Sequence, residues 1–158
     1  MHAENPEEEV VQIREYRASD VAFIANSWLK SLRSSLAYSG VPNDIYYQMH
    51  HRLLEHLIPR STVLVLCNME DPDQIVAWAC MEREPDIFLL HYVYVKHSLR
   101  KNGFMSLLLR EALSREDVKF KFCTHMTPAF DALRPRHRGW IYNPYALYTR
   151  LPGDWGSQ

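Results

Sequence analysis

A short basic turn around Gly103 carries the residue types best suited to chemistry in this sequence. Lys96, Arg100 and Lys101 precede the glycine, and an amphipathic pattern begins immediately after it. A helix that starts there has unpaired backbone N–H groups and a partial positive charge at its first turn. Basic side chains beside a helix N-terminus form an anion site. The sequence therefore predicts a phosphate-binding turn.

Two regular elements must hold that turn in place. The run 89–95, LLHYVYV, is apolar and rich in β-branched and aromatic residues, which is typical of a buried strand. After the turn, Phe104, Leu107, Leu108 and Ala112 recur at helical spacing. A strand followed by a helix predicts a ligand site beyond the carboxyl end of the strand, where open α/β sheets place their ligands.

The rest of the chain predicts a regular succession of strands and helices. Turn residues and prolines separate the segments, and Ser19 or Asp20 can cap the first helix. We expect strands at 10–16, 62–67, 75–82, 87–95, 119–124 and 140–148, the last interrupted at Asn143 and Pro144, and helices from about 20 to 38, 43 to 59, 104 to 114 and 127 to 133. This order predicts an α/β fold with a mixed central sheet of about six strands flanked by helices.

Residues 100–105, RKNGFM, resemble the R/Q-x-x-G-x-G/A pyrophosphate loop of the GNAT superfamily of N-acetyltransferases. As in that family, a strand ending in a valine, Val95, precedes the loop. Residues 17–20, RASD, resemble the R-x-x-D motif at the family's first helix. The resemblance implies the GNAT fold, in which two central strands part to admit the pantetheine arm of acetyl-CoA. Met105 departs from the small residue found at the last loop position.

The resemblance also implies acetyl-CoA as co-substrate and partner. It assigns cofactor binding to two strand positions and to the whole turn, namely Val93, Val95, Arg100, Lys101, Asn102, Gly103, Phe104, Met105 and Ser106. The basic run 134–138, RPRHR, is either a contact for an acidic partner or for the 3′-phosphate of CoA, or a solvated loop.

Candidates for the catalytic base follow from the same resemblance. Many GNAT enzymes carry a glutamate on the strand before the loop, and the comparable position here is Leu89, which cannot accept a proton. Side chains alternate along a strand, so His91, Val93 and Val95 share the face of Leu89 if no bulge intervenes. His91 is therefore the preferred base, with Glu82 and Glu84 of the preceding strand as alternatives. A histidine hydrogen-bonded within the sheet for structural reasons is the competing interpretation.

Candidates for the acid that protonates the leaving thiolate lie near the C-terminus. The family's usual tyrosine is missing from residues 127–134, which leaves Tyr142 and Tyr145 of the terminal segment, or aromatic packing alone. The run 142–145, YNPY, also resembles small bacteriophage-encoded GNAT-like proteins. Because base and acid both depart from the family pattern, two functions stay open. One is acetyl transfer to the amine of a small molecule or protein, and the other is a catalytically degenerate protein that binds CoA or a protein partner.

Aromatic residues on the first two predicted helices mark the region where GNAT proteins shape the acceptor pocket. Trp28, Tyr38, Tyr46 and Tyr47 lie there, and the same residues would serve core packing. The second helix also carries His50, His51 and His56. We interpret these histidines as ordinary surface polarity, because no third metal ligand is evident. No metal site is predicted.

Composition bounds the remaining expectations. The 158 residues suit one domain over 10–150, with a disordered acidic tail at 1–9 and a flexible tail at 151–158. A net charge of −1 gives no reason to expect nucleic acid or an anionic membrane as partner. The N-terminus lacks the features of a signal peptide, so we expect a cytoplasmic protein, monomeric or homodimeric. Cys67, Cys80 and Cys123 are expected to be small buried hydrophobes.

Overall fold

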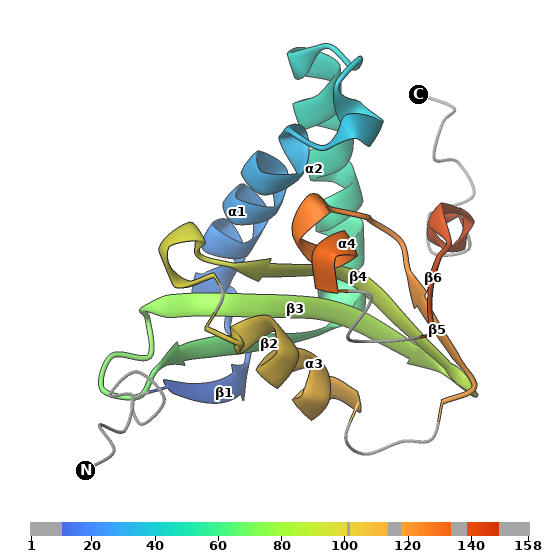
Figure 1. The fold of residues 1–158 in the computed structure, drawn as a ribbon. Coiled ribbons are helices and arrows are strands. Elements are labelled where there is room, and N and C mark those ends of the chain that lie inside the picture. The colour runs from blue at the N-terminus through green and yellow to red at the C-terminus, as the bar shows by residue number, and fades with distance from the viewer. Residues whose placement is uncertain (1–10, 101, 114–117, 134–138, 149–158) are drawn as a thin grey trace.

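A six-stranded mixed sheet organises the computed structural model, which describes residues 11–100, 102–113, 118–133 and 139–148. Helices α1 and α2 cover one face of the sheet and α3 covers the other (Figure 1). The elements are β1 Val11–Glu15, α1 Val21–Arg33, α2 Asn43–Arg60, β2 Thr62–Asn68, β3 Ile75–Glu84, β4 Ile87–Val95, α3 Phe104–Leu113, β5 Phe120–Cys123, α4 Pro128–Leu133 and β6 Trp140–Tyr142. The predicted α/β fold is confirmed.

The strands lie side by side in chain order, from β1 to β6. The first four pair antiparallel, whereas β4 with β5 and β5 with β6 pair parallel. Parallel neighbours need a crossover connection, and α3 supplies it between β4 and β5. The turn predicted to bind phosphate therefore lies in the crossover that leaves the centre of the sheet.

Two hydrophobic cores hold the helices against the sheet. On the α1 and α2 face, the ring of Trp28 stacks on Tyr92 with centroids 5.0 Å apart and packs against Trp78 at 5.4 Å. On the α3 face, Phe88 and Leu108 are fully buried in the second cluster. Rigid layers on both faces fix the position of β4, from which the candidate site is built.

A β-bulge interrupts β4 at His91. Met81 of β3 pairs with Leu90, and the adjacent residue Cys80 pairs with Tyr92, so the register of that ladder skips His91. A bulge adds one residue to one strand and shifts the alternation of side chains beyond it.

The bulge overturns one expectation about the faces of β4. Leu90, Val93 and Val95 all belong to the core on the α3 face, while Tyr92 belongs to the core under α1 and α2. The prediction that His91 shares a face with Val93 and Val95 was wrong, because it depended on an uninterrupted strand.

Beyond the bulge, β4 and β5 part. Their parallel pairing runs from Ile87 opposite Phe120 to Leu90 opposite Cys123, and β5 ends there. β4 continues for five further residues, to Val95. The parting that the family resemblance implies is present at the carboxyl ends of these strands.

The first helix is shorter than predicted. It ends at Arg33 rather than near Tyr38, because the Arg33 guanidinium donates to the carbonyl oxygens of Tyr38 and Val41, at 2.6 Å each, and folds the chain back. At the other end of α1, Asp20 accepts a hydrogen bond from the backbone N–H of Arg17 at 2.7 Å. Asp20 directly precedes α1 but makes no side-chain capping bond to it, so the capping role predicted for this residue is not confirmed.

The terminal strand is also shorter than predicted. β6 ends at Tyr142, and residues Pro144–Leu147 form a 3-10 turn, because proline has no N–H to continue a ladder. The tails 1–9 and 151–158 and the basic run 134–138 lie outside the described residues. Within the described part, no helix is both long and apolar enough to cross a membrane.

Candidate functional site

The predicted phosphate turn closes the carboxyl end of β4. Gly103 has a φ of +78°, and α3 begins at the next residue, Phe104, as predicted. Few residues other than glycine adopt this backbone conformation without strain. The first turn of α3 follows directly, so its backbone N–H groups lie at the mouth of the parted strands. Lys101 lies outside the described residues.

A cavity of about 200 Å³ occupies the space between the end of β4 and α1. Its walls come from α1, β4, the turn and the segment that leads into α4: Ser31, Ser34, Tyr92, Val93, Tyr94, Val95, Arg100, Met105, Thr127 and Pro128. The cavity thus brings together four of the predicted cofactor residues, Val93, Val95, Arg100 and Met105. Phe104 is instead buried in the core under α3.

Arg100 links the strand to the turn. Its Nε donates to the carbonyl oxygen of Val95 at 3.2 Å. Arg100 also lines a neighbouring hollow of about 510 Å³, where Lys30 of α1 contributes a second cationic side chain. Two cations and a helix N-terminus around one opening favour an anionic ligand.

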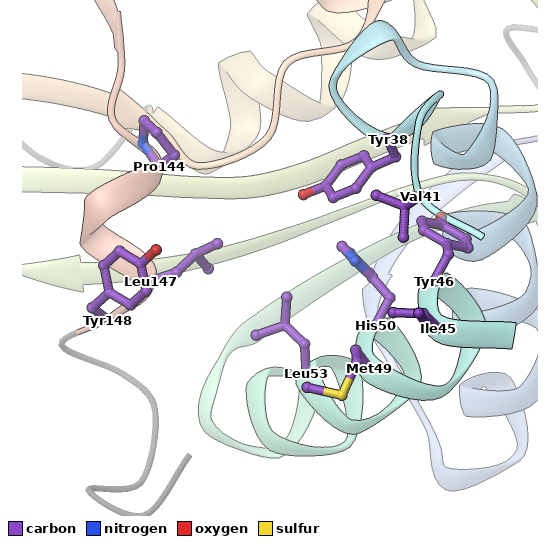
Figure 2. A pocket seen from close by; sticks show the side chains of 10 residues that line it. All are labelled: Tyr38, Val41, Ile45, Tyr46, Met49, His50, Leu53, Pro144, Leu147 and Tyr148. Carbon is purple, nitrogen blue, oxygen red and sulfur yellow. The ribbon is translucent and has the colours of Figure 1, made fainter. Parts of the chain in front are cut away.

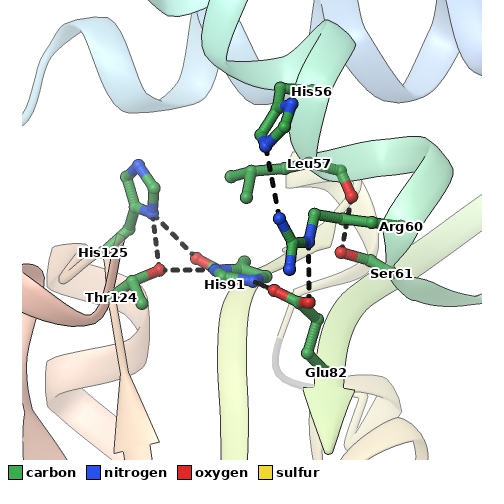
Figure 3. Close-up of polar contacts among 8 residues, drawn as sticks. All are labelled: His56, Leu57, Arg60, Ser61, Glu82, His91, Thr124 and His125. Carbon is green, nitrogen blue, oxygen red and sulfur yellow. Dashed lines mark hydrogen bonds and ion pairs between the residues drawn. The ribbon is translucent and has the colours of Figure 1, made fainter. Parts of the chain in front are cut away.

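The preferred base candidate, His91, is completely buried, with 0% of its surface exposed. Its Nε2 donates to Oε2 of Glu82 at 2.6 Å, and Oε1 of Glu82 accepts from Nε of Arg60 at 3.0 Å (Figure 3). Burial alone would raise the pKa of Glu82, but the bonds to His91 and Arg60 outweigh it and lower that pKa. Glu82 is therefore held as a carboxylate. Glu84 is an exposed residue at the end of β3.

Further polar groups lie on the other side of the His91 ring, at Nδ1, opposite the nitrogen that binds Glu82. Nδ1 of His91 lies 3.0 Å from Oγ1 of Thr124, which lies 3.0 Å from Nδ1 of His125 (Figure 3). That Nδ1 also donates to the carbonyl oxygen of His91 at 3.1 Å, and Nε2 of His125 lies 3.2 Å from Nε2 of His50. These contacts connect Glu82 to α2 through the interior.

His50 and His125 are both uncharged at neutral pH. Burial lowers the pKa of His50 to about 4. Burial, with added repulsion from His50 and His91, lowers the pKa of His125 well below its ordinary value. A neutral imidazole has one donor nitrogen and one acceptor nitrogen, so each ring can pass a hydrogen bond onward.

His50 opens into a second cavity, of about 320 Å³. The side chains that surround it are mostly apolar or aromatic and come from α2, the turn before it and the terminal segment: Tyr38, Val41, Ile45, Tyr46, Met49, His50, Leu53, Pro144, Leu147 and Tyr148 (Figure 2). Such a cavity, with few polar groups, is typical of a small-ligand site. It lies in the region predicted to shape an acceptor pocket, and it includes Tyr38 and Tyr46.

The tyrosines predicted as acids occupy less central places. Tyr142 is 44% exposed and Tyr145 is 74% exposed, and neither lines the described cavities. Burial raises the pKa of Tyr142, and the neighbouring Cys123 adds to this. Tyr148 is the terminal tyrosine that lines the second cavity.

Sequence reasoning missed three residues of the polar set. His50 was interpreted as surface polarity, yet it is buried, whereas its neighbour His51 is exposed and pairs with Glu55 at 3.0 Å. The helical spacing from Tyr46 through His50 to Leu54 could have indicated this. No pattern pointed to Thr124 or His125, which follow the end of β5.

Other sequence predictions concern cysteines and metals. Cys67, Cys80 and Cys123 are free and buried, as expected. Among the described residues, no group of three potential ligands is placed to hold a metal ion.

Comparisons with known proteins bear on the fold. No protein-family model matches the sequence, and no curated protein matches it. Solved structures do match. A possible acetyltransferase from Clostridium difficile 630 superposes with a TM-score of 0.56 at 16% identity, over 81% of this chain and 88% of that one.

Two further structures carry ligands. A GNAT family acetyltransferase from Brucella melitensis in complex with acetyl-CoA gives a TM-score of 0.50 at 17% identity, over 78% of this chain and 80% of that one. AAC(6')-Iy in complex with the bisubstrate analogue CoA-S-monomethyl-acetylneamine gives 0.50 at 12% identity, over 87% and 88%. At these identities the likeness shows the fold, which is that of the GNAT acetyltransferases.

Proposed function

We propose that this GNAT-fold chain is an acetyl-CoA-dependent N-acetyltransferase that acts on an amine of a small molecule or protein. The observation that carries the proposal is the parting of β4 from β5 beside a cavity that ends at a cationic turn. Open α/β sheets place ligands at such an edge, and the turn offers a phosphate its helix N-terminus.

In this proposal the pyrophosphate of acetyl-CoA binds the backbone N–H groups of residues 101–106. Asn102, Gly103 and Ser106 contribute main-chain donors, and Met105 can do so as well, because binding uses its N–H and not its side chain. Arg100 and Lys30 neutralise phosphate charge at the opening. The pantetheine arm then follows the edge of β4 at Val93 and Val95, inside the cavity of about 200 Å³.

The chemical step requires a proton acceptor. The amine nitrogen attacks the thioester carbonyl, and its proton must leave before the amide forms. We assign acceptance of that proton to the pair His91 and Glu82, the second of which is already held as a carboxylate. Since His91 is fully buried, the proton reaches it through intervening groups. The leaving thiolate, with a pKa near 8.5 for an ordinary thiol, needs little help from Tyr142 or Tyr145.

A catalytically degenerate protein that binds CoA or a protein partner is the second candidate. It is favoured by Leu89, which occupies the family's glutamate position, and by the burial of His91. The three free cysteines suit the reducing cytoplasm, in which we place either function.

Calorimetry and a turnover assay separate these candidates. We expect acetyl-CoA and CoA to bind, and acetyl-CoA at 100 times its dissociation constant to add about 2.7 kcal/mol of stability. Thiol release is then followed with a panel of primary amines that includes an aminoglycoside, a polyamine and a lysine-containing peptide. Binding without turnover would support the degenerate protein, and the absence of binding would overturn both.

A further inference from the structure

The buried polar groups between Glu82 and His50 form one continuous chain of hydrogen bonds. It runs from Glu82 to His91, Thr124, His125 and His50, with successive contacts of 2.6, 3.0, 3.0 and 3.2 Å. Four of the five side chains are buried, and Glu82 is largely so, at 11% exposure. The stability of the core does not require such a chain, since apolar residues of the same shape would make the core about as stable.

When all three imidazole rings are neutral, the partners at two points fix the direction of every hydrogen bond. A carboxylate only accepts, so Nε2 of His91 carries a hydrogen toward Glu82 and leaves Nδ1 as an acceptor. A carbonyl also only accepts, so Nδ1 of His125 carries a hydrogen toward the oxygen of His91 and Oγ1 of Thr124.

The remaining hydrogens follow from these assignments. The Thr124 hydroxyl receives from His125 and donates to Nδ1 of His91. Nε2 of His125 is left as an acceptor, so Nε2 of His50 donates to it. Each donor then points toward Glu82. Nδ1 of His50 is left as an acceptor, and among the described residues no hydrogen bond reaches it.

We propose that His50, His125, Thr124 and His91 form a relay that accepts the proton of the acceptor amine at Nδ1 of His50 and carries its charge to Glu82. This inference rests on the proposed acetyl transfer and names the group that meets the acceptor. His50 lines the cavity of about 320 Å³, which then holds the amine. His50 is the catalytic residue of the relay, and Thr124, His125 and His91 are positioning residues that act through it.

The relay returns to its starting state within one reaction cycle. When the amine nitrogen bonds to the thioester carbon, its proton goes to Nδ1 of His50. One hydrogen then shifts along each bond until Glu82 is protonated. When the C–S bond breaks, the electron pair leaves with sulfur, the hydrogens shift back, and Nδ1 returns the proton to the thiolate. An amine and a thioester thus become an amide and a thiol, and the protein is unchanged.

The shifted state is unstable in a way that favours this return. After the shift, Nδ1 of His125 no longer carries a hydrogen, yet it still lies 3.1 Å from the carbonyl oxygen of His91. Two acceptors at that distance repel each other. The relay therefore holds the proton only while the tetrahedral intermediate exists, and it needs no separate tyrosine as acid.

The position of His125 supports a role between the two substrates. Its ring lies 5.2 Å from that of His50, which lines the proposed acceptor cavity, and 6.2 Å from that of Tyr92, which lines the proposed cofactor cavity. Thr124 lines neither cavity, so a change there interrupts the relay without altering a binding surface.

Nitrogen NMR of the histidine rings tests the hydrogen positions in the unmodified protein. With ¹⁵N-labelled histidine, we expect the hydrogen on Nδ1 in His125 and on Nε2 in His91 and His50. This measurement needs no substrate and no turnover. A hydrogen on Nε2 of His125, or a His50 that is charged at pH 7, would overturn the relay.

The pair Thr124→Val and Thr124→Ser tests the function of the chain. Valine keeps the shape and removes the hydroxyl, and we expect kcat to fall roughly 100-fold, as for loss of a general base. Serine restores the hydroxyl and should stay within about threefold of the native kcat. The solvent isotope effect on kcat should decrease in the valine variant alone, and the acetyl-CoA dissociation constant should be unchanged in both. Equal rates for the two variants would overturn the relay while leaving the proposed function intact.

Imidazole rescue provides a test that does not depend on the folding of the Thr124 variants. His50→Ala opens the relay at the cavity, so added imidazole should restore part of its acetyl transfer. His51→Ala, a change at the exposed neighbour, should neither slow the reaction nor respond to imidazole. A native rate in His50→Ala would overturn the relay alone. A native protein that binds acetyl-CoA and acetylates no amine would overturn the proposed function and the relay together.

Discussion

The two sides of the gap between β4 and β5 are built in opposite ways. The proposed cofactor side is a run of consecutive residues, 100–106, which would bind phosphate through backbone N–H groups and which includes one glycine with a positive φ. The proposed acceptor side is a set of side chains from β3, β4, α2 and the end of β5, joined across as many as 75 positions of sequence. A local site depends on backbone conformation, whereas a dispersed site depends on the packing of the whole core.

Gly103→Val should have the largest effect, and on the cofactor side alone. A β-branched residue at this φ strains the turn by about 1–3 kcal/mol, and the turn must rearrange. We expect the affinity for CoA to fall by at least roughly 100-fold, because the N–H groups of the first turn lose their common direction. Isothermal calorimetry measures this loss, and thermal unfolding shows whether the fold persists.

Gly40→Val is the matched control for that change. Gly40 also has no atom within 4 Å of an added Cβ, but its φ is not positive. Its variant should bind CoA as the native chain does. An unchanged CoA affinity in Gly103→Val would refute the assignment of the turn.

His91→Ala should affect the rate and leave the cofactor side unchanged. Loss of general-base assistance lowers the maximal rate by roughly 100-fold, while the CoA dissociation constant stays nearly constant. Steady-state kinetics over a range of pH, with calorimetry of CoA binding, gives both values. If the pH–rate profile were identical to that of the native chain, the base would have to be another group, namely His50, Glu82, Glu84 or solvent.

Acidification should destabilise the acceptor side first. The pKa of His50 is about 4 in the folded protein, and the ordinary value of 6.5 applies in the unfolded chain. The stability that depends on the neutral ring is therefore fully present above pH 6.5. As pH falls from 6.5 toward 4, the unfolded chain takes up a proton that the folded chain does not, and on the order of 3 kcal/mol of stability is lost. Buried His125 adds to this loss in the same direction.

Urea unfolding between pH 7 and pH 4 measures that slope. His50→Gln keeps a donor for His125 and cannot titrate, so its slope should be smaller by up to about 1.4 kcal/mol per pH unit. His51→Gln, at the exposed neighbouring position, should retain the native slope. A native slope in His50→Gln would mean that this ring is not held neutral.

Tyr142→Phe and Tyr145→Phe should have the smallest effects. Both hydroxyls lie outside the described cavities, and a thiolate leaves without much assistance. We expect each change to lower the rate by at most about tenfold, or roughly 1.4 kcal/mol of barrier. A loss of 100-fold in either variant, measured as thiol release, would return the acid role to the terminal segment.

Sequence patterns predicted the fold and the turn at Gly103 because both depend on local features. The apolar run before Val95, the glycine and the helical spacing after it are all contained within about two dozen residues, so periodicity and turn chemistry suffice. The same local rules gave most strand and helix positions. They failed at residues 34–38, where the bonds from the Arg33 side chain to the carbonyl oxygens of Tyr38 and Val41 fold the chain back.

The acceptor side could not be predicted in the same way. The contacts between His91 and Thr124 and between His50 and His125 arise only once β5 lies beside β4 and α2 lies across them. The bulge at His91 was left open as a condition, and no sequence signal placed it. Local pattern therefore pointed to His91 and its carboxylate partner Glu82. It missed His50, Thr124 and His125, the other members of the proposed relay.

The single extra residue in β4 divides this strand into two halves of opposite parity. Before His91, even-numbered residues such as Phe88 and Leu90 face α3, and after it odd-numbered residues such as Val93 and Val95 do. If β4 instead ran through His91 as a regular ladder, with no bulge, Tyr92 and Tyr94 would turn toward α3 and the valines toward α1. Both walls of the gap would exchange their chemistry at once. The packing of Tyr92 in one core and of Val93 and Val95 in the other therefore holds the bulge at His91 in place.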